Sequence, residues 1–147
     1  MGRLVKKYPS KSKIKFIACE ALYTGHGGKL TLVGTYPGEI IVLHTKVVPD
    51  KKKLVGAINL ALVFLVSAAD GEFETKILLS GKPIGESQTF DAGPAKIRPD
   101  ASGTIAFAIN GIPIYCAGRI GVSLLLDDKT YRFPIEIRIE RPPASEA

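Results

Sequence analysis

Hydrophobic and polar residues alternate strictly in the last regular segment of the chain, residues 131–140. Each apolar residue in this segment is followed by a charged residue or by Pro134. A period of two residues is that of a β-strand with one face toward a core and the other toward water. The pattern therefore predicts a final strand whose buried side carries Tyr131, Phe133, Ile135, Ile137 and Ile139.

The same period recurs along the chain, and no window shows a helical period. Turn residues follow about every ten positions, a spacing typical of two packed antiparallel sheets. The predicted fold class is all-β, an antiparallel β-sandwich (immunoglobulin-like or related) with eight or nine strands. Residues 91–102 hold two prolines and a glycine and predict a crossing loop. The predicted strands cover residues 13–23, 30–36, 39–44, 54–68, 73–79, 103–110, 119–126 and 131–140, with a further short strand at 87–90.

Glycine and aspartate mark the turns between these strands. Asp70-Gly71 is typical of a tight hairpin, so residues 73–79 are expected to pair back on residues 54–68. A bulge is expected near Gly56, because a glycine inside a strand often marks one. Gly25–Gly28 and Asp127–Thr130 predict two further turns.

The chain has 147 residues, the length of one domain. We expect a β-sandwich over residues 13–140, a flexible basic arm over 1–12 and a frayed tail over 141–147. The formal net charge is +6, and residues 1–15 hold six basic residues and no acid. Subtracting these six from the 20 basic residues leaves 14, which balance the 14 acids. The six are Arg3, Lys6, Lys7, Lys11, Lys13 and Lys15.

This basic arm has two interpretations. It can be a solvated arm that aids solubility, or it can contact nucleic acid, an anionic lipid surface or another polyanion. Its single arginine and single aromatic residue, Tyr8, argue against strong nucleic-acid binding, because bidentate readout and base stacking use more of both.

Neither a secretory signal nor a membrane span is predicted. The first fifteen residues contain no apolar segment of the kind that a signal peptide needs. The most apolar run, residues 54–69, is shorter than the roughly 20 residues that cross a bilayer. We therefore expect a cytoplasmic protein, with Cys19 and Cys116 reduced and acting as small buried apolar residues.

Three segments resemble a bacterial family of small uncharacterised proteins that share a domain of unknown function. They are Phe16-Ile-Ala-Cys-Glu20, the motif Gly28-Lys-Leu-Thr-Leu-Val-Gly34, and the glycine-led segment from Gly118 to Asp128. The likeness covers residues 14–140, and Lys29–Gly34 is its most specific part. The resemblance implies one β-rich domain and assigns no catalytic or binding residue. The basic arm and the glycine-rich turn around His26 depart from the family pattern.

No known catalytic or metal motif occurs in the chain. The two histidines, His26 and His44, and the two cysteines lie at least seven positions apart, which excludes the usual zinc spacings. The turn at Gly25–Gly28 lacks the Lys-Ser/Thr of a phosphate-binding loop, and no nucleophile elbow is present. The turn aspartates are too few and scattered to predict calcium. We therefore expect no enzyme, no catalytic residue, no cofactor and no metal.

Residues 54–68 carry apolar side chains on both faces of the predicted strand. The outer face holds Val55, Ala61, Val63 and Leu65 and must be covered, either by a partner or by a loop such as 91–102. The leading hypothesis is a non-enzymatic interaction or assembly module that forms a homo-oligomer or a protein complex through this face. The alternatives are polyanion binding by the basic arm and a ligand site formed by the loops at Gly25–Gly28, Asp70-Gly71 and Asp127–Thr130.

Overall fold

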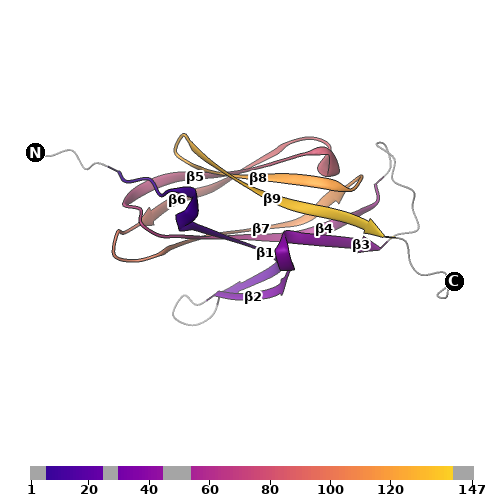
Figure 1. Cartoon of the computed structure of the whole chain (residues 1–147), viewed down its shortest axis with the longest axis horizontal. Coiled ribbons are helices and arrows are strands. Elements are labelled where there is room, and N and C mark those ends of the chain that lie inside the picture. The colour runs from indigo at the N-terminus through magenta and orange to yellow at the C-terminus, as the bar shows by residue number, and fades with distance from the viewer. Residues whose placement is uncertain (1–5, 25–29, 45–53, 141–147) are drawn as a thin grey trace, which may run out of the picture.

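The structure is a computed structural model and describes residues 6–24, 30–44 and 54–140. Nine strands form two stacked sheets, which confirms the predicted all-β sandwich (Figure 1). In the described ranges the helical elements are three short 3-10 turns, and no helix is long and apolar enough to cross a membrane. The strands are β1 (Ile14–Thr24), β2 (Leu30–Thr35), β3 (Ile40–His44), β4 (Gly56–Val66), β5 (Gly71–Ser80), β6 (Gln88–Ile97), β7 (Gly103–Ile114), β8 (Gly118–Leu126) and β9 (Lys129–Glu140). The 3-10 turns are η1 (Lys11–Lys13), η3 (Pro37–Glu39) and η4 (Lys82–Ile84).

The chain passes repeatedly from one sheet to the other. The four-stranded sheet has the order β2-β1-β4-β7, and the five-stranded sheet has the order β3-β9-β8-β5-β6. Neighbouring strands are antiparallel, as predicted, except that β3 pairs with β9 in parallel. This parallel pair forms because β3 crosses from the end of β2 to the far edge of the other sheet.

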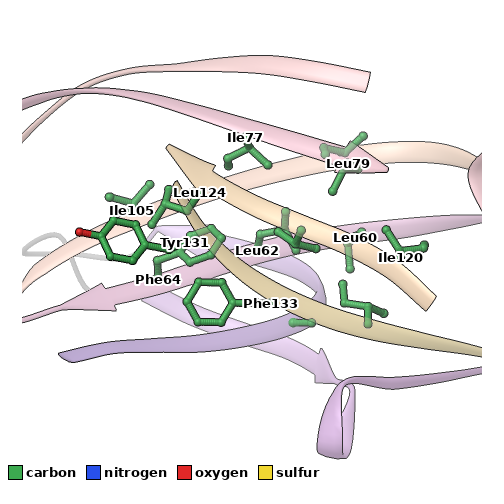
Figure 2. Close-up of a cluster of buried hydrophobic side chains, with 14 of the residues drawn as sticks. Leu60, Leu62, Phe64, Ile77, Leu79, Ile105, Ile120, Leu124, Tyr131 and Phe133 are labelled. Carbon is green, nitrogen blue, oxygen red and sulfur yellow. The ribbon is translucent and has the colours of Figure 1, made fainter. Parts of the chain in front are cut away.

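The hydrophobic core lies between the two sheets (Figure 2). Phe16 of β1, Phe64 of β4 and Phe133 of β9 form a triangle of rings: the centroid of Phe16 lies 5.2 Å from that of Phe64 and 5.1 Å from that of Phe133, and the last two are 5.7 Å apart. The alternation predicted for the last strand is confirmed from Tyr131 to Ile137, whose apolar members are buried. Each fully buried large apolar side chain contributes roughly 1.5–3 kcal/mol, so this layer is the main source of stability.

The hairpin predicted at Asp70-Gly71 is wrong, because β4 and β5 belong to different sheets. Ala68 and Gly71 have φ angles of +56° and +139°, which turn the chain out of one sheet and into the other. The backbone of Asp70 instead pairs with that of Lys7, with N–O distances of 2.8 and 2.9 Å. Turn propensity is local and does not specify which sheet receives the next strand.

The crossing loop predicted at residues 91–102 is also wrong over its first half. Residues 88–97 form β6, an edge strand of the five-stranded sheet. Proline is tolerated in an edge strand, where its missing N–H faces away from the ladder, and Pro94 occupies such a position opposite Glu74. The sequence signal of Gly93-Pro94 therefore marked an edge strand rather than a loop.

The bulge expected near Gly56 lies on the neighbouring strand, β7. Ile58 pairs with Ile112 and Leu60 with Ile109, so β7 contains one extra residue. Gly111 has a φ of +71° at this point and donates its N–H to the side-chain oxygen of Asn59 over 3.1 Å. The extra residue changes which positions of β7 face the core, from odd-numbered to even-numbered ones.

Candidate interaction surface

The outer face of the four-stranded sheet carries small apolar side chains at its centre. In the strand register, Ala61 lies between Cys19 and Ala108, and Val63 lies beside Ala106. This face points away from the core, as the sequence predicted. Cys19, Ala61 and Val63 are nevertheless buried, Val63 with 1% of its surface exposed, and they are not part of the core between the sheets. The chain itself therefore covers the centre of this face.

The β1–β2 hairpin lies on that side of the sheet. In Figure 1 the second half of β1 and the whole of β2 run below the four-stranded sheet, away from the five-stranded one. Leu22 and Leu32, which pair directly across the hairpin, are half-buried. Among the described residues, the hairpin is the segment that lies on this side of the sheet.

A bend at Glu20 and Gly34 separates the hairpin from the sheet. The pairing of β1 with β4 ends at Cys19, and beyond it β1 pairs with β2 alone. Gly34 has a φ of +66°, and a Cβ atom there would lie 2.7 Å from Oε2 of Glu20. Glycine at this position allows both the left-handed conformation and the close approach of the carboxylate.

The predicted partner interface changes accordingly. Ala61 and Val63 are buried within the chain. A partner can therefore reach only Val55 and Leu65, which are half-buried. The segment 91–102, which the sequence analysis offered as an intramolecular cover, instead contributes to β6 of the other sheet, and the β1–β2 hairpin lies on this side. The sequence does not reveal this, because a strand that leaves its sheet keeps the same period of two.

The hairpin exposes its own apolar residues to solvent. Tyr23, Leu30 and Val33 are three of the five exposed large hydrophobic side chains of the described residues, with Tyr23 exposed by 62% and Val33 by 43%. Tyr23 pairs with Thr31, and Ala21 pairs with Val33, so Tyr23 and Val33 share one face of the hairpin. The alternation of residues 30–36 predicted a strand but not this exposure.

Neither a protein-family model nor a curated protein sequence matches this chain. The resemblance of Gly28–Gly34 to a bacterial family therefore stays a prediction, and the part of that motif described in the structure, Leu30–Gly34, lies in β2.

The basic segment predicted as a flexible arm contacts the sandwich from Lys6 onward. Nζ of Lys6 lies 3.0 Å from Oδ2 of Asp127, and Nζ of Lys11 lies 5.4 Å from the ring centre of Phe133. The hydroxyl of Tyr131 donates to the carbonyl oxygen of Pro9 over 2.6 Å. Residues 6–12 thus differ from the free arm that their charge suggested. Lys13 and Lys15 are exposed, the backbone of Lys7 pairs with Asp70, and Arg3 lies outside the described residues.

Asp127 is the centre of this N-terminal contact. Its Oδ2 accepts a 2.7 Å hydrogen bond from the hydroxyl of Tyr8, and its Oδ1 accepts one from the backbone N–H of Glu74 at 2.9 Å. The bond from Tyr8 lowers the pKa of Asp127, and the same bond raises the pKa of Tyr8 to about 12. Sequence reasoning placed Asp127 correctly in the turn between β8 and β9 but missed its role as the acceptor for Tyr8.

Two of the three loops suggested for a ligand site do meet. Asp70-Gly71 and Asp127 lie at the same end of the sandwich, where Lys6 contacts Asp127 and a Cβ on Gly71 would lie 3.0 Å from the Lys6 side chain. Residues 6–8 occupy the space between them. The third loop, Gly25–Gly28, lies outside the described residues, as does His26.

The remaining titratable groups do not gather into a recognised catalytic arrangement. Within residues 6–24, 30–44 and 54–140, no group of three or more His, Cys, Asp or Glu side chains could hold a metal ion. Burial raises the pKa of the Cys19 thiol, which disfavours the reactive thiolate. Cys116 is half-buried and lines an open cleft of about 760 Å³ together with Lys82 and Tyr115.

Proposed function

We propose that this protein is a non-enzymatic, cytoplasmic assembly module that associates with a second copy of itself through the exposed surface of the β1–β2 hairpin. The observation that supports this proposal is the pair of exposed side chains Tyr23 and Val33 on one face of this short hairpin, with exposed Leu30 on its other face. Contiguous exposed apolar residues on a soluble domain commonly mark an interaction site. The hairpin replaces the outer face of β4 as the contact surface, because the centre of that face is already covered.

The chemistry of these three side chains suits a protein contact. Burying a large apolar side chain contributes roughly 1.5–3 kcal/mol, and a tyrosine adds a large, rigid and amphipathic contact area. Tyr23 and Val33 lie on the same face, so one flat surface can bury both at once.

Light scattering of two matched variants tests the proposal. Val33 in β2 and Val42 in β3 are the same residue type in edge strands of opposite sheets, with exposures of 43% and 40%. We expect the wild-type protein to form a defined oligomer, Val33→Lys to reduce it to a monomer, and Val42→Lys to leave it intact. A wild-type monomer across the accessible concentration range, or an oligomer that survives Val33→Lys, overturns the proposal.

Polyanion binding by the basic segment is the alternative function, and the geometry favours it less. Lys6 is paired with the carboxylate of Asp127, and Lys11 lies over an aromatic ring, so two of the six basic residues already have partners. An exposed ion pair contributes little to stability, so a polyanion could still compete with Asp127 for Lys6.

A further inference from the structure

We propose that the two copies join by antiparallel pairing of β2 with β2, so that their hairpins form one continuous four-stranded layer across a two-fold axis. This inference rests on the proposed function, since it specifies how the same hairpin makes its contact. Among the described residues, β2 lies at the edge of its sheet and pairs on one side only, with β1.

The sequence of β2 offers no protection against strand pairing. Edge strands of soluble proteins usually carry charged residues, proline or a bulge, which prevent the unpaired backbone groups from joining another chain. β2 reads Leu30-Thr-Leu-Val-Gly-Thr35 and contains neither a charged residue nor proline. Its backbone edge is therefore open to an added strand.

Two of the other edge strands carry such protection. β6 contains Asp91, Pro94 and Lys96 and has a register shift opposite Thr75. β7 contains Pro113 and the bulge at Gly111. These two edges also lie against each other, because Phe90 of β6 packs on Phe107 of β7 with ring centroids 5.3 Å apart.

The fourth edge, β3, is the competing site. It is five residues long and also lacks charge and proline, but Ile41 is buried and Val42 is its one exposed large hydrophobic side chain. β2 by contrast exposes two, Leu30 and Val33, and Tyr23 of β1 shares the face of Val33. The larger apolar surface favours β2.

A second copy of the chain fits this edge better than an unrelated strand. Antiparallel pairing of identical strands is self-complementary about a two-fold axis, so both copies satisfy the same backbone groups. No like charges oppose each other, since β2 has none. A two-stranded ribbon is marginally stable by itself, and pairing would extend each ribbon to four strands. Val33 of both copies would then lie on the shared surface beside Tyr23.

Spin labels on β2 test the pairing mode directly. Thr31→Cys and Thr35→Cys, each made separately in a Cys19→Ala, Cys116→Ser background because Cys19 pairs with residue 35, report the distance between equivalent residues of the two copies. In an antiparallel pair with a rise of about 3.4 Å per residue, this distance grows by about 7 Å for each residue away from the axis. With the axis between the two sites, we expect the two separations along the strand to sum to roughly 27 Å. A label at Val42→Cys should report a much longer distance.

The outcomes separate the pairing mode from the proposed function. If the oligomer persists and depends on Val33 but the labels at Thr31 and Thr35 do not follow this gradient, the strand pairing is overturned while the assembly role stands. A short distance at Val42→Cys assigns the contact to β3 and also overturns the pairing. If both the labelled and the unlabelled proteins are monomeric, the strand pairing and the assembly role are both overturned.

Amide hydrogen exchange checks the same point without any variant. Strand pairing should slow the exchange of β2 amides as concentration rises, and the amides of β6 should not change. Exchange in β2 that is independent of concentration, in a sample shown to be oligomeric, overturns the pairing.

Discussion

A single carboxylate, that of Asp127, fixes the N-terminal segment to the sandwich. It accepts hydrogen bonds from the hydroxyl of Tyr8 and the backbone of Glu74, and it lies 3.0 Å from the Lys6 ammonium. Asp127 has a φ of +55°, a conformation that aspartate and asparagine tolerate better than other residues. The residue therefore both forms the β8–β9 turn and orients its carboxylate toward Tyr8.

This contact should respond to alkaline pH. The pKa of Tyr8 is raised from 10.0 to about 12, so its contribution to stability is complete below pH 10 and is lost as the pH rises toward 12. The matching loss for Asp127, whose pKa is lowered, occurs in acid, as the pH falls below about 4. We expect an ultraviolet titration to show one tyrosine ionising near pH 12 together with release of residues 6–12.

Two variants assign the effect. Burial also raises the pKa values of Tyr36 and Tyr131, so Tyr8→Phe assigns the ionisation near pH 12, which it should remove. Asp127→Asn, which keeps the turn, should return the pKa of Tyr8 toward 10, because the hydrogen bond to a charged carboxylate is lost. An unchanged titration in Asp127→Asn would contradict the role of the carboxylate.

Alanine substitutions at three glycines distinguish the cost of backbone strain from the cost of steric contact. Gly56→Ala should be neutral or stabilising by about 0.5–1 kcal/mol, because it has no positive φ and nothing lies within 4 Å of the added Cβ. Gly93→Ala, with a φ of +80° and open space, should cost about 1–2 kcal/mol of unfolding free energy. Gly34→Ala should cost more, because its Cβ also meets Glu20.

Denaturant unfolding of these variants, with Glu20→Ala added to Gly34→Ala, measures the steric part. We expect Glu20→Ala to lower the cost of Gly34→Ala but not fully to that of Gly93→Ala, because the Cβ of residue 20 remains 3.0 Å from the added Cβ. Equal costs for Gly34→Ala with and without Glu20 would show that the bend does not depend on their close approach.

At the scale of elements, periodicity located the strands but not their neighbours. The alternation in residues 131–140 is a property of one strand against one core, and it was confirmed. The partner of β4 depends on how the chain crosses after Asp70, and a turn signal carries no such information. Apolar residues on both faces of β4 did indicate a second cover. The hairpin that lies on that side begins at the bend at Glu20 and Gly34, for which the sequence offers only a single glycine.

The covered face of β4 makes its own prediction. Val63 is 1% exposed, and its neighbour in the register, Ala106, is exposed. Val63→Asp buries an unpaired charge and should lower the free energy of unfolding by several kcal/mol. Ala106→Asp places the same group in water one strand away and should change stability by no more than about 0.5 kcal/mol.

Thermal unfolding of the two variants, with light scattering of the folded fractions, checks this point. A stable Val63→Asp protein that has lost its oligomer would return the contact surface to the outer face of β4 and contradict the hairpin cover.

At the scale of the whole molecule, the two sheets present different outer surfaces. The outer side of the five-stranded sheet carries the exposed charges of Arg119, Arg132 and Arg138, with Arg138 paired to Glu136 over 3.3 Å. The other side presents the hairpin, where β2 has no charged residue. The uncharged strand β2 is therefore better suited to contact a partner than the charged outer side of the five-stranded sheet.

This difference predicts how assembly depends on salt. Contacts between apolar side chains and paired backbones are not screened by ions, whereas contacts between exposed charges weaken when the Debye length falls from about 30 Å at 0.01 M to about 8 Å at 0.15 M. We therefore expect the mass measured by light scattering to be the same at both ionic strengths. An oligomer that dissociates at the higher salt would instead implicate the basic residues between Lys6 and Lys15. In that case, replacing the exposed Lys13 and Lys15 by glutamine should dissociate the oligomer as salt does. Replacing Lys76 and Lys129 by glutamine changes the net charge by the same amount and serves as the control, which should leave the oligomer intact.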